Sequence, residues 1–232
     1  MLNLVAASAF FVLIHLLISG TRVRDGLIAR IGQGPYMGLF VVLSWIGLIW
    51  LGFAFSQARG SPANEPYWTV GEASRHIQMA IQLLAVLLIV VGLSTRNPTS
   101  VRQEGAIERP DVVKGILRVT RHPFLWGVAL WALGHLVVNG DRASLILFGS
   151  LLILAVSGTA SIDAKRKHAL GPAWDSFAAQ TSNIPFAAIV AGRQRLILSE
   201  IGVWRILAAV AVYLALVLGH PFYTGVPALA AA

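Results

Sequence analysis

No cysteine occurs among the 232 residues of this chain. Its absence excludes disulfide bonds, iron–sulfur clusters, thiolate-ligated haem and the C-x-x-C-H attachment of c-type haem. It also excludes a cysteine nucleophile. Any metal or cofactor must therefore be held by histidine, carboxylate, tyrosine or methionine side chains.

Charged residues are scarce as well. They make up 12% of the chain, whereas hydrophobic residues make up 56%, and a typical soluble domain is about a quarter charged. The sequence therefore predicts an integral membrane protein. The 18 Lys and Arg residues outnumber the 10 acids. They cluster between apolar runs, which favours a lipid bilayer with anionic headgroups over nucleic acid as the partner.

Six apolar runs predict an all-α fold, an integral membrane bundle of six transmembrane helices. Each run is close to the roughly 17–25 residues that a helix needs to cross the hydrocarbon, and the runs cover residues 2–19, 36–55, 77–94, 123–139, 143–160 and 203–219. The short link between the fourth and fifth runs predicts an antiparallel hairpin. Because the sequence shows no repeat, low-complexity tract or linker, we expect a single domain over residues 1–232.

Lysine and arginine predict the orientation of these helices. The loops at 20–35, 95–122 and 161–202 hold three, six and five of these residues, whereas the loops at 56–76 and 140–142 hold two and one. By the positive-inside rule, the three basic loops face the cytoplasm and both termini face the opposite side.

The last of these basic loops contains a predicted amphipathic helix. Leu170, Trp174 and Phe177 recur at helical spacing beside the basic run at 165–168. A basic flank with an aromatic, apolar face is typical of helices that lie in the headgroup region. We therefore expect an interfacial amphipathic helix on the cytoplasmic leaflet.

Two histidines lie deep within the apolar runs, His15 in the first and His135 in the fourth. Ionisable side chains inside a bilayer are costly and usually functional. Neutral imidazole is a common metal ligand and a usual axial ligand of haem iron. Two interpretations stay open here: the pair ligates a metal, or each histidine hydrogen-bonds a neighbouring polar group and so fixes helix packing. Gly127 and Gly134 in the fourth run predict close approach of another helix.

Arg121 and His122 come directly before Pro123, and proline is favoured at the first position of a helix. We therefore expect both side chains at the cytoplasmic mouth of the fourth span. There they suit an anionic group, or they anchor the helix to lipid headgroups. His76 and His220 lie near the opposite interface, where a solvated rim is the simpler interpretation.

Several stretches resemble the NnrU family, in order along nearly the whole chain. They are FFVLIHLLISGTR at 10–22, TRHPFLWGVALWALGHLVVNGD at 120–141, GPAWDSFAAQTSNIPFAAI at 171–189 and GHPFYTG at 219–225. NnrU proteins are multi-helical membrane proteins associated with bacterial denitrification and nitric oxide metabolism. The resemblance therefore implies the bacterial inner membrane, and the distribution of Lys and Arg then predicts both termini on its periplasmic side.

The plant zeta-carotene cis–trans isomerase belongs to the same superfamily and is a haem b enzyme with histidine axial ligands. By this resemblance His15 and His135 are the candidate ligands of a haem b iron, and Arg121, His122 and His76 are supporting cofactor-binding residues. With alternating topology, however, the two candidate ligands differ in depth by about 10 Å. Either a broken or tilted helix brings them onto one iron, or one of them binds iron at a time.

Three kinds of function follow from these features. A haem protein can bind nitric oxide, exchange electrons with a membrane redox partner, or isomerise a small lipophilic polyene. The R-H-P stretch at 121–123 also resembles isoprenylcysteine carboxyl methyltransferases, which bind S-adenosylmethionine, although Asp163 stands alone where those enzymes carry paired glutamates. The third is a non-enzymatic accessory or transport role in denitrification, in which Lys114, Arg118 and Arg121 attract nitrite.

Overall fold

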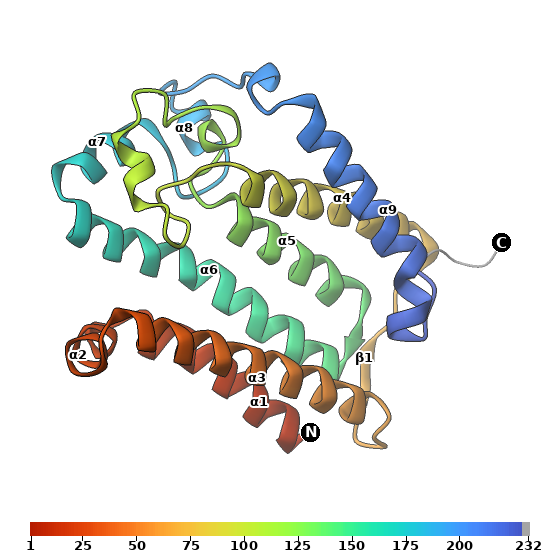
Figure 1. Ribbon diagram of the computed structural model, residues 1–232. Helices are drawn as coiled ribbons and strands as arrows, with labels where there is room; N and C mark the ends of the chain where they lie inside the picture. The colour runs from red at the N-terminus through yellow and green to blue at the C-terminus, as the bar shows by residue number, and fades with distance from the viewer. Residues whose placement is uncertain (229–232) are drawn as a thin grey trace. The chain divides into compact units, whose positions relative to one another are not determined.

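The structure, a computed structural model, describes residues 1–228 except for the side chain of Glu72. It is built of helices, as the sequence predicts, with one short pair of strands (Figure 1). In chain order the elements are α1 (Leu2–Leu13), the π-helical turn η1 (Ile14–Ile18), α2 (Arg22–Ile31), α3 (Gln33–Arg59), β1 (Pro66–Trp68), α4 (Glu72–Ser94), the 3₁₀ turns η2 (Glu104–Glu108) and η3 (Gly115–Arg118), α5 (Pro123–Val138), β2 (Gly140–Asp141), α6 (Arg142–Leu170), α7 (Pro172–Gln180), α8 (Ala187–Val190), the 3₁₀ turn η4 (Leu198–Glu200) and α9 (Val203–Thr224).

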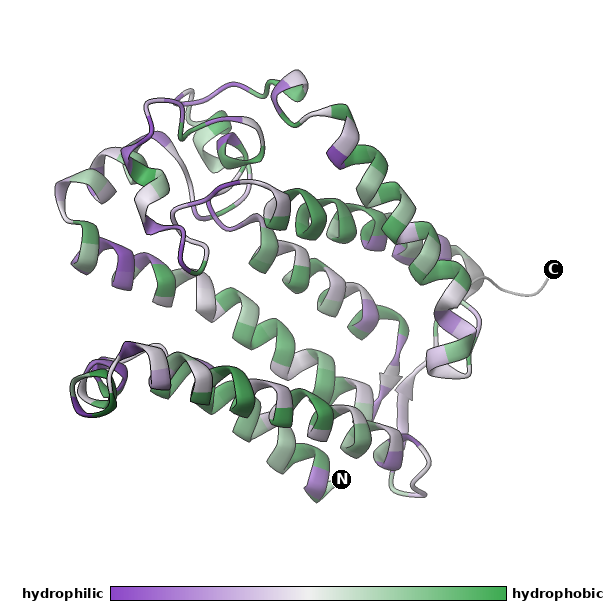
Figure 2. Cartoon of the chain, in the orientation of Figure 1, coloured by the Kyte–Doolittle hydropathy of each residue, from purple (hydrophilic) through white to green (hydrophobic). Residues whose placement is uncertain are grey.

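Within residues 1–228, four helices are long and apolar enough to cross a membrane, namely α3, α4 from Ala73 onward, α6 and α9. Figure 2 shows hydrophobic residues along most of each of them. A bent pair of helices near the N-terminus makes a fifth span if its two arms count as one. The prediction of six spans is therefore not confirmed, because the first and fourth predicted spans take other forms.

The first predicted span is broken. α1 continues into η1, and the chain then bends by 79° before α2. At the break, a Cβ on Gly20 would collide with the Leu16 carbonyl oxygen and lie 2.9 Å from Ser161 Oγ, so a larger residue does not fit. The Thr21 hydroxyl then accepts a hydrogen bond from the Val23 N–H at 3.2 Å and caps the new helix.

The fourth predicted span, α5, has 16 residues. At 1.5 Å per residue it is about 24 Å long, which is shorter than the hydrocarbon layer of roughly 30 Å. The chain then reverses as predicted: α6 begins at Arg142, four positions after α5 ends at Val138, and His135 of α5 stacks on Phe148 of α6. Between the two helices, β2 pairs antiparallel with β1. The Trp68 indole N–H donates to the Val137 carbonyl at 2.9 Å and ties β1 to the end of α5.

The contacts divide the chain into two compact units. Unit 1 comprises Met1–Val70 and Ala132–Ile162, and unit 2 comprises Gly71–Trp131 and the described residues from Asp163 onward. Helices α5 and α6 run through both, and the single domain predicted from the sequence stays a prediction. The core of unit 1 joins α1, α3 and the start of α6 through small and aliphatic residues, which allow close helix approach: Leu4, Ala7, Leu51, Ala54, Ala58 and Ala143.

The predicted amphipathic helix is present as α7, but protein covers its apolar face. Trp174 and Phe177 are 3% and 2% exposed. They belong to the core of unit 2, where they pack with aliphatic side chains of α4 and of the segment before α5: Val91, Ile116, Leu117 and Val119. The prediction of an interfacial helix is wrong in this respect, because helical spacing reveals an apolar face but not what covers it.

Helices α4 and α5 approach closely at Gly127. A Cβ there would lie 2.8 Å from the Ala85 carbonyl oxygen and 2.9 Å from the Ile89 nitrogen. We expect Gly127→Ala to lower the free energy of unfolding by about 1–3 kcal/mol, because overpacking forces the two backbones apart. Thermal unfolding of the purified protein in detergent measures this loss. Gly52→Ala in α3 is the matched control, since a Cβ there meets nothing within 4 Å, and an equal loss in both variants would refute the close approach.

Candidate functional site

His15 lies on the π-helical turn η1 of unit 1. Its Nδ1 is 2.7 Å from the Phe11 carbonyl oxygen, one turn earlier in the chain. Because a carbonyl only accepts, Nδ1 carries the proton of the neutral ring and the lone pair is on Nε2. Metal-ligating histidines usually have this arrangement, with the second ring nitrogen donating to a carbonyl or a carboxylate. Single π-helical turns are also frequent at functional sites.

Two phenylalanine rings hold the His15 imidazole. The ring centroids of Phe11 and Phe40 are 4.5 Å and 5.1 Å from the imidazole centroid. The same two rings line an apolar pocket of about 270 Å³ on α1 and α3, together with Val41, Ser44, Trp45 and Leu48. Trp45 is 61% exposed. The pocket therefore opens on an apolar outer surface, which would face lipid in a membrane.

His135 lies on α5, in the part of that helix that belongs to unit 1. Its ring stacks on Phe148 of α6, with the centroids 4.7 Å apart. Phe148 is 6% exposed and meets Phe55 of α3 edge-on, at 6.0 Å between centroids. His135 thus lies in an aromatic cluster near the C-terminal end of α3.

The described contacts do not bring His15 and His135 together. His15 lies beside Phe40, whereas Phe148, the partner of His135, lies beside Phe55. The levels of Phe40 and Phe55 differ by about 22 Å along α3, and the ring contacts shorten this difference in part. Two axial ligands of one iron need nitrogens about 4 Å apart. Ligation of one iron by both histidines stays a prediction that requires another arrangement of these helices.

The available donors fit a porphyrin better than a bare metal ion. Among the described residues, no group of three or more His, Asp or Glu side chains could hold a metal ion. A bare zinc ion takes three or four protein ligands, whereas haem iron takes four nitrogens from its macrocycle and one or two ligands from the protein. A carbonyl-oriented imidazole beside an apolar pocket, as at His15, is therefore a donor that suits haem.

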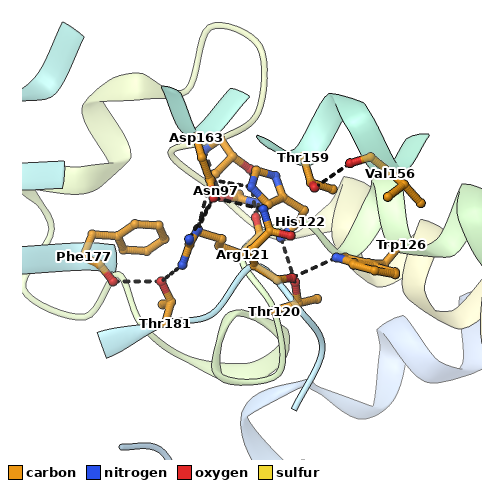
Figure 3. Close-up of polar contacts among 12 residues, drawn as sticks. Asn97, Thr120, Arg121, His122, Trp126, Val156, Thr159, Asp163, Phe177 and Thr181 are labelled. Atoms are coloured by element: carbon orange, nitrogen blue, oxygen red, sulfur yellow. Dashed lines mark hydrogen bonds and ion pairs between the residues drawn. The ribbon is translucent and has the colours of Figure 1, made fainter. Parts of the chain in front are cut away.

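Arg121 and His122 lie together in unit 2, where Asp163 of α6 joins them (Figure 3). The Arg121 guanidinium donates to both carboxylate oxygens of Asp163, with Nε 3.0 Å from Oδ1 and Nη2 2.8 Å from Oδ2. His122 Nε2 is 2.6 Å from Oδ1, and Asn183 Nδ2 donates to Oδ2 at 3.0 Å. Three side chains thus donate hydrogen bonds to one carboxylate, and these bonds offset the free-energy cost of burying its charge.

Further hydrogen bonds fix the backbone of this cluster. Asn97 Nδ2 donates to the Arg121 carbonyl at 2.9 Å. Thr120 Oγ1 and Trp126 Nε1 donate to the Asn183 carbonyl at 2.6 Å and 2.8 Å. These residues, like Asp163 as the partner of Arg121, were not predicted from the sequence. Thr120 beside the R-H-P stretch is of a type that commonly hydrogen-bonds the backbone, but Asn97 and Asn183 lie 24 and 62 positions from Arg121, so no local pattern indicates them.

His122 is held as a neutral imidazole. It is 2% exposed, and burial lowers the pKa of its ring against the opposing effect of Asp163. An ionised carboxylate only accepts, so Nε2 carries the proton and the lone pair is on Nδ1. The pair with Asp163 therefore fixes the tautomer of His122, which is a requirement for any role in binding or proton transfer.

Arg121 does not present an open anion site in this structure, because Asp163 neutralises its charge. The other two cations expected to attract nitrite are paired as well. Lys114 and Arg118 each lie against a carboxylate, at 2.5 Å and 2.7 Å. Asp163 is likewise engaged by protein donors, so nothing in its geometry favours a contact with the amine of S-adenosylmethionine.

The remaining histidine of the predicted site, His76, lies near the start of α4 in unit 2, and its side chain is exposed. His220 lies near the end of α9, where its Nδ1 is 2.6 Å from the Val226 carbonyl oxygen. Both positions agree with a rim near the ends of helices. The supporting role of His76 in cofactor binding stays a prediction.

Comparison with known proteins adds a family and two relatives. The model of the family described as NnrU protein matches residues 3–228. The chain is similar to "15-cis-zeta-carotene isomerase, chloroplastic" of Zea mays, with 32% identity over 94 residues, and to the protein of that name from Arabidopsis thaliana, with 33% identity over 92 residues. These matches cover 39% and 38% of this chain but 26% and 25% of the relatives, about a quarter of their length. No solved structure matches the chain.

Loss of the Asp163 carboxylate would leave Arg121, 13% exposed, without its counter-charge. We expect Asp163→Asn to lower the free energy of unfolding by about 3–5 kcal/mol, the usual cost of breaking a buried pair. Unfolding in detergent measures the difference. Asp175→Asn is the matched control, because Asp175 is 62% exposed and 3.9 Å from Lys167, and an exposed pair contributes about 0–1 kcal/mol. Losses of the same size would mean that the Asp163 cluster is not a stabilising contact.

The lowered pKa of His122 should make stability depend on pH. The unfolded chain protonates this histidine below about pH 6.5, whereas the buried ring stays neutral to a lower pH. The stability that the folded protein gains from keeping His122 neutral is therefore complete above about pH 6.5, and it is lost as the pH falls below that value. We expect His122→Gln to remove up to about 1.4 kcal/mol per pH unit from this dependence in unfolding measured between about pH 5 and pH 7.5. His168→Gln, at an exposed position, should keep the slope, and an unaltered slope in His122→Gln would exclude this origin.

Proposed function

Because the chain belongs to the NnrU family and is similar to two zeta-carotene isomerases, we propose that it is a membrane protein that binds haem b and catalyses cis–trans isomerisation of a lipophilic polyene. The helices of spanning length support the membrane location. The isomerase activity for which the two relatives are named supports the class of reaction. A bacterial inner membrane with both termini on the periplasmic side is part of the same proposal.

The observation that carries this proposal is the orientation of His15. Its Nδ1–H donates to the Phe11 carbonyl, which directs the lone pair to Nε2 as in other ligating imidazoles. In the proposal His15 holds the haem iron and His135 is the second candidate ligand. Arg121 and His122 support the site indirectly, because their cluster orders the segment from which α5, the helix of His135, begins.

When bound, haem supplies an iron with a coordination position that can take a double bond or a small diatomic ligand. The residues of this chain would orient the histidine that holds the group. The rings of Phe11 and Phe40 pack against the His15 ring and restrain its orientation. No acid or base is required for the rotation of a double bond in this scheme, which agrees with the apolar surroundings of His15.

The pocket beside His15 supports a lipophilic substrate. The hydroxyl in its lining, on Ser44, donates to the Phe40 carbonyl at 2.7 Å, so the walls offer aromatic and aliphatic surface. Trp45 at its edge is exposed, which lets an apolar chain enter from the bilayer. The volume of about 270 Å³ is near the lower end of ligand pockets, roughly 300–1,000 Å³. It suits one segment of an extended polyene, with the remainder in lipid.

Nitric oxide binding is a second candidate function, and one observation favours it. The described contacts place His15 and His135 at different levels of α3. A haem iron held by one imidazole of the protein would keep a coordination position for nitric oxide, and a membrane redox partner would set the iron's oxidation state. The methyltransferase and the nitrite-binding accessory role have weaker support, because Asp163 and the cations assigned to them are already paired.

The haem proposal predicts a visible spectrum. We expect protein purified from haem-replete cells to show a Soret band that shifts on reduction with dithionite, and His15→Ala to lose it. His135→Ala reports on the second ligand: the band persists if His15 alone holds the iron, and it is lost or shifted if both do. His168→Gln is the control, because that histidine is exposed. A colourless protein, or a band untouched by either alanine variant, would overturn the proposal.

The reaction needs its own measurement, made on the same preparations. A cis-polyene in liposomes containing the haem-loaded protein should convert to the trans isomer, as followed by chromatography, and His15→Ala should abolish the conversion. A Soret shift with nitric oxide and no conversion of any polyene would instead favour the second function.

A further inference from the structure

A second pocket lies in unit 2, where α4 ends and α9 begins. Its volume is about 290 Å³, and four cationic side chains line it: Arg96, Arg109, Lys114 and Arg205. Asp111 is the one acidic residue in its lining. The residues come from the segment that follows α4, which is one of the basic loops that the positive-inside rule assigns to the cytoplasmic side, and from the first turn of α9.

The pocket keeps an excess of positive charge. Asp111 is shared between two of the cations, at 2.5 Å from Lys114 Nζ and 3.3 Å from Arg109 Nε. Four cations against one carboxylate leave a formal charge of +3. Among the described contacts, no ion pair involves Arg96 or Arg205. A concave site with this charge attracts an anion.

Arg205 is fixed at the pocket by neutral partners. Its Nη1 donates to the Ile201 carbonyl at 2.9 Å, and Nε and Nη2 approach the Ser94 carbonyl at the end of α4, each at 3.4 Å. Its guanidinium lies over the Trp204 ring at 4.8 Å from the centroid. These contacts orient the cation without cancelling its charge, so it remains available to an anionic group.

The surface beside this pocket is apolar. Leu93 at the end of α4 is 65% exposed, and the start of α9 exposes Val203, Trp204 and Leu207 by 72%, 59% and 63%. These residues begin or end helices of membrane-spanning length, so the pocket lies at a membrane interface. Tryptophan is enriched at that level of a bilayer. A cationic pocket bordered by lipid-facing aliphatic side chains has the two surfaces that a phospholipid needs.

We propose that this pocket binds the phosphate group of an anionic phospholipid, with the acyl chains along Leu93 and the start of α9. Basic pockets between membrane helices on the cytoplasmic side are known to bind acidic headgroups. A free phosphate would use the same cations but not the apolar border, which is why the lipid is the better fit. The site is independent of the haem proposal, because none of its residues contacts His15 or His135 among the described contacts.

The test compares two double variants that remove the same charge. Arg96→Gln/Arg109→Gln removes two cationic side chains from the pocket lining. It keeps Arg205, which contacts the Ser94 carbonyl at the end of α4. Arg102→Gln/Arg195→Gln is the matched control, because both of these arginines are exposed and neither lines the pocket. Native mass spectrometry of the full chain in detergent measures binding of palmitoyl-oleoyl-phosphatidylglycerol. The phosphatidylcholine with the same acyl chains is the uncharged comparison.

We expect the pocket variant to bind phosphatidylglycerol about twenty-five-fold more weakly, since it loses two basic side chains and each one near a headgroup contributes roughly fivefold. The control should change by less than about twofold, and phosphatidylcholine should bind weakly to all proteins. Equal losses in both variants, or equal binding of both lipids, would overturn the proposal. Inorganic phosphate that binds alone and displaces the lipid would assign the pocket to a free anion. Equal unfolding temperatures without lipid would confirm that both variants are folded. If the double variant at Arg96 and Arg109 unfolds at a lower temperature, the single variant Arg96→Gln replaces it.

Discussion

The ion pair between Arg121 and Asp163 is the contact on which the arrangement around the start of α5 depends. A carboxylate near the end of an apolar helix is stable when donors surround it, and here His122 and Asn183 complete the set. Non-helical backbone at membrane depth is tolerated where protein satisfies it. A helix that begins in such a cluster need not cross the whole hydrocarbon layer, which gives a physical reason for the short length of α5.

The sequence predicts much of the fold, because hydropathy is a property of each segment by itself. Four of the six predicted spans correspond to helices long enough to cross a membrane, and the reversal before Arg142 is where the turn residues indicate it. The bend after Ile18 could not be predicted in the same way. The bend depends on contact between Gly20 and Ser161, which lies 141 residues later in the chain. It also depends on whether the local backbone forms α-helical or π-helical hydrogen bonds.

The candidate site was predicted unevenly, for a related reason. The R-H-P stretch is visible because charged residues beside a span are rare, but its partner Asp163 is 42 positions from Arg121 and follows no spacing rule. The amphipathic pattern of Trp174 and Phe177 was visible too, and it gave the direction of the apolar face. Protein core and headgroup layer both select the same pattern, so only tertiary contacts distinguish the two.

His15 and His135 show why a residue type in a membrane span does not define its role. Both are imidazoles in apolar surroundings, but His15, on a π-helical turn, has its Nδ1–H bonded to the Phe11 carbonyl of α1, whereas His135 is stacked on the buried ring of Phe148. A ligating nitrogen must carry a lone pair and must be held in a fixed orientation. A hydrogen bond from the other ring nitrogen to a carbonyl, as at His15, favours both conditions. Stacking on Phe148 restrains the orientation of the His135 ring. In the haem proposal, the hydrogen bond to the Phe11 carbonyl is therefore the feature of His15 that favours Nε2 as the ligating atom.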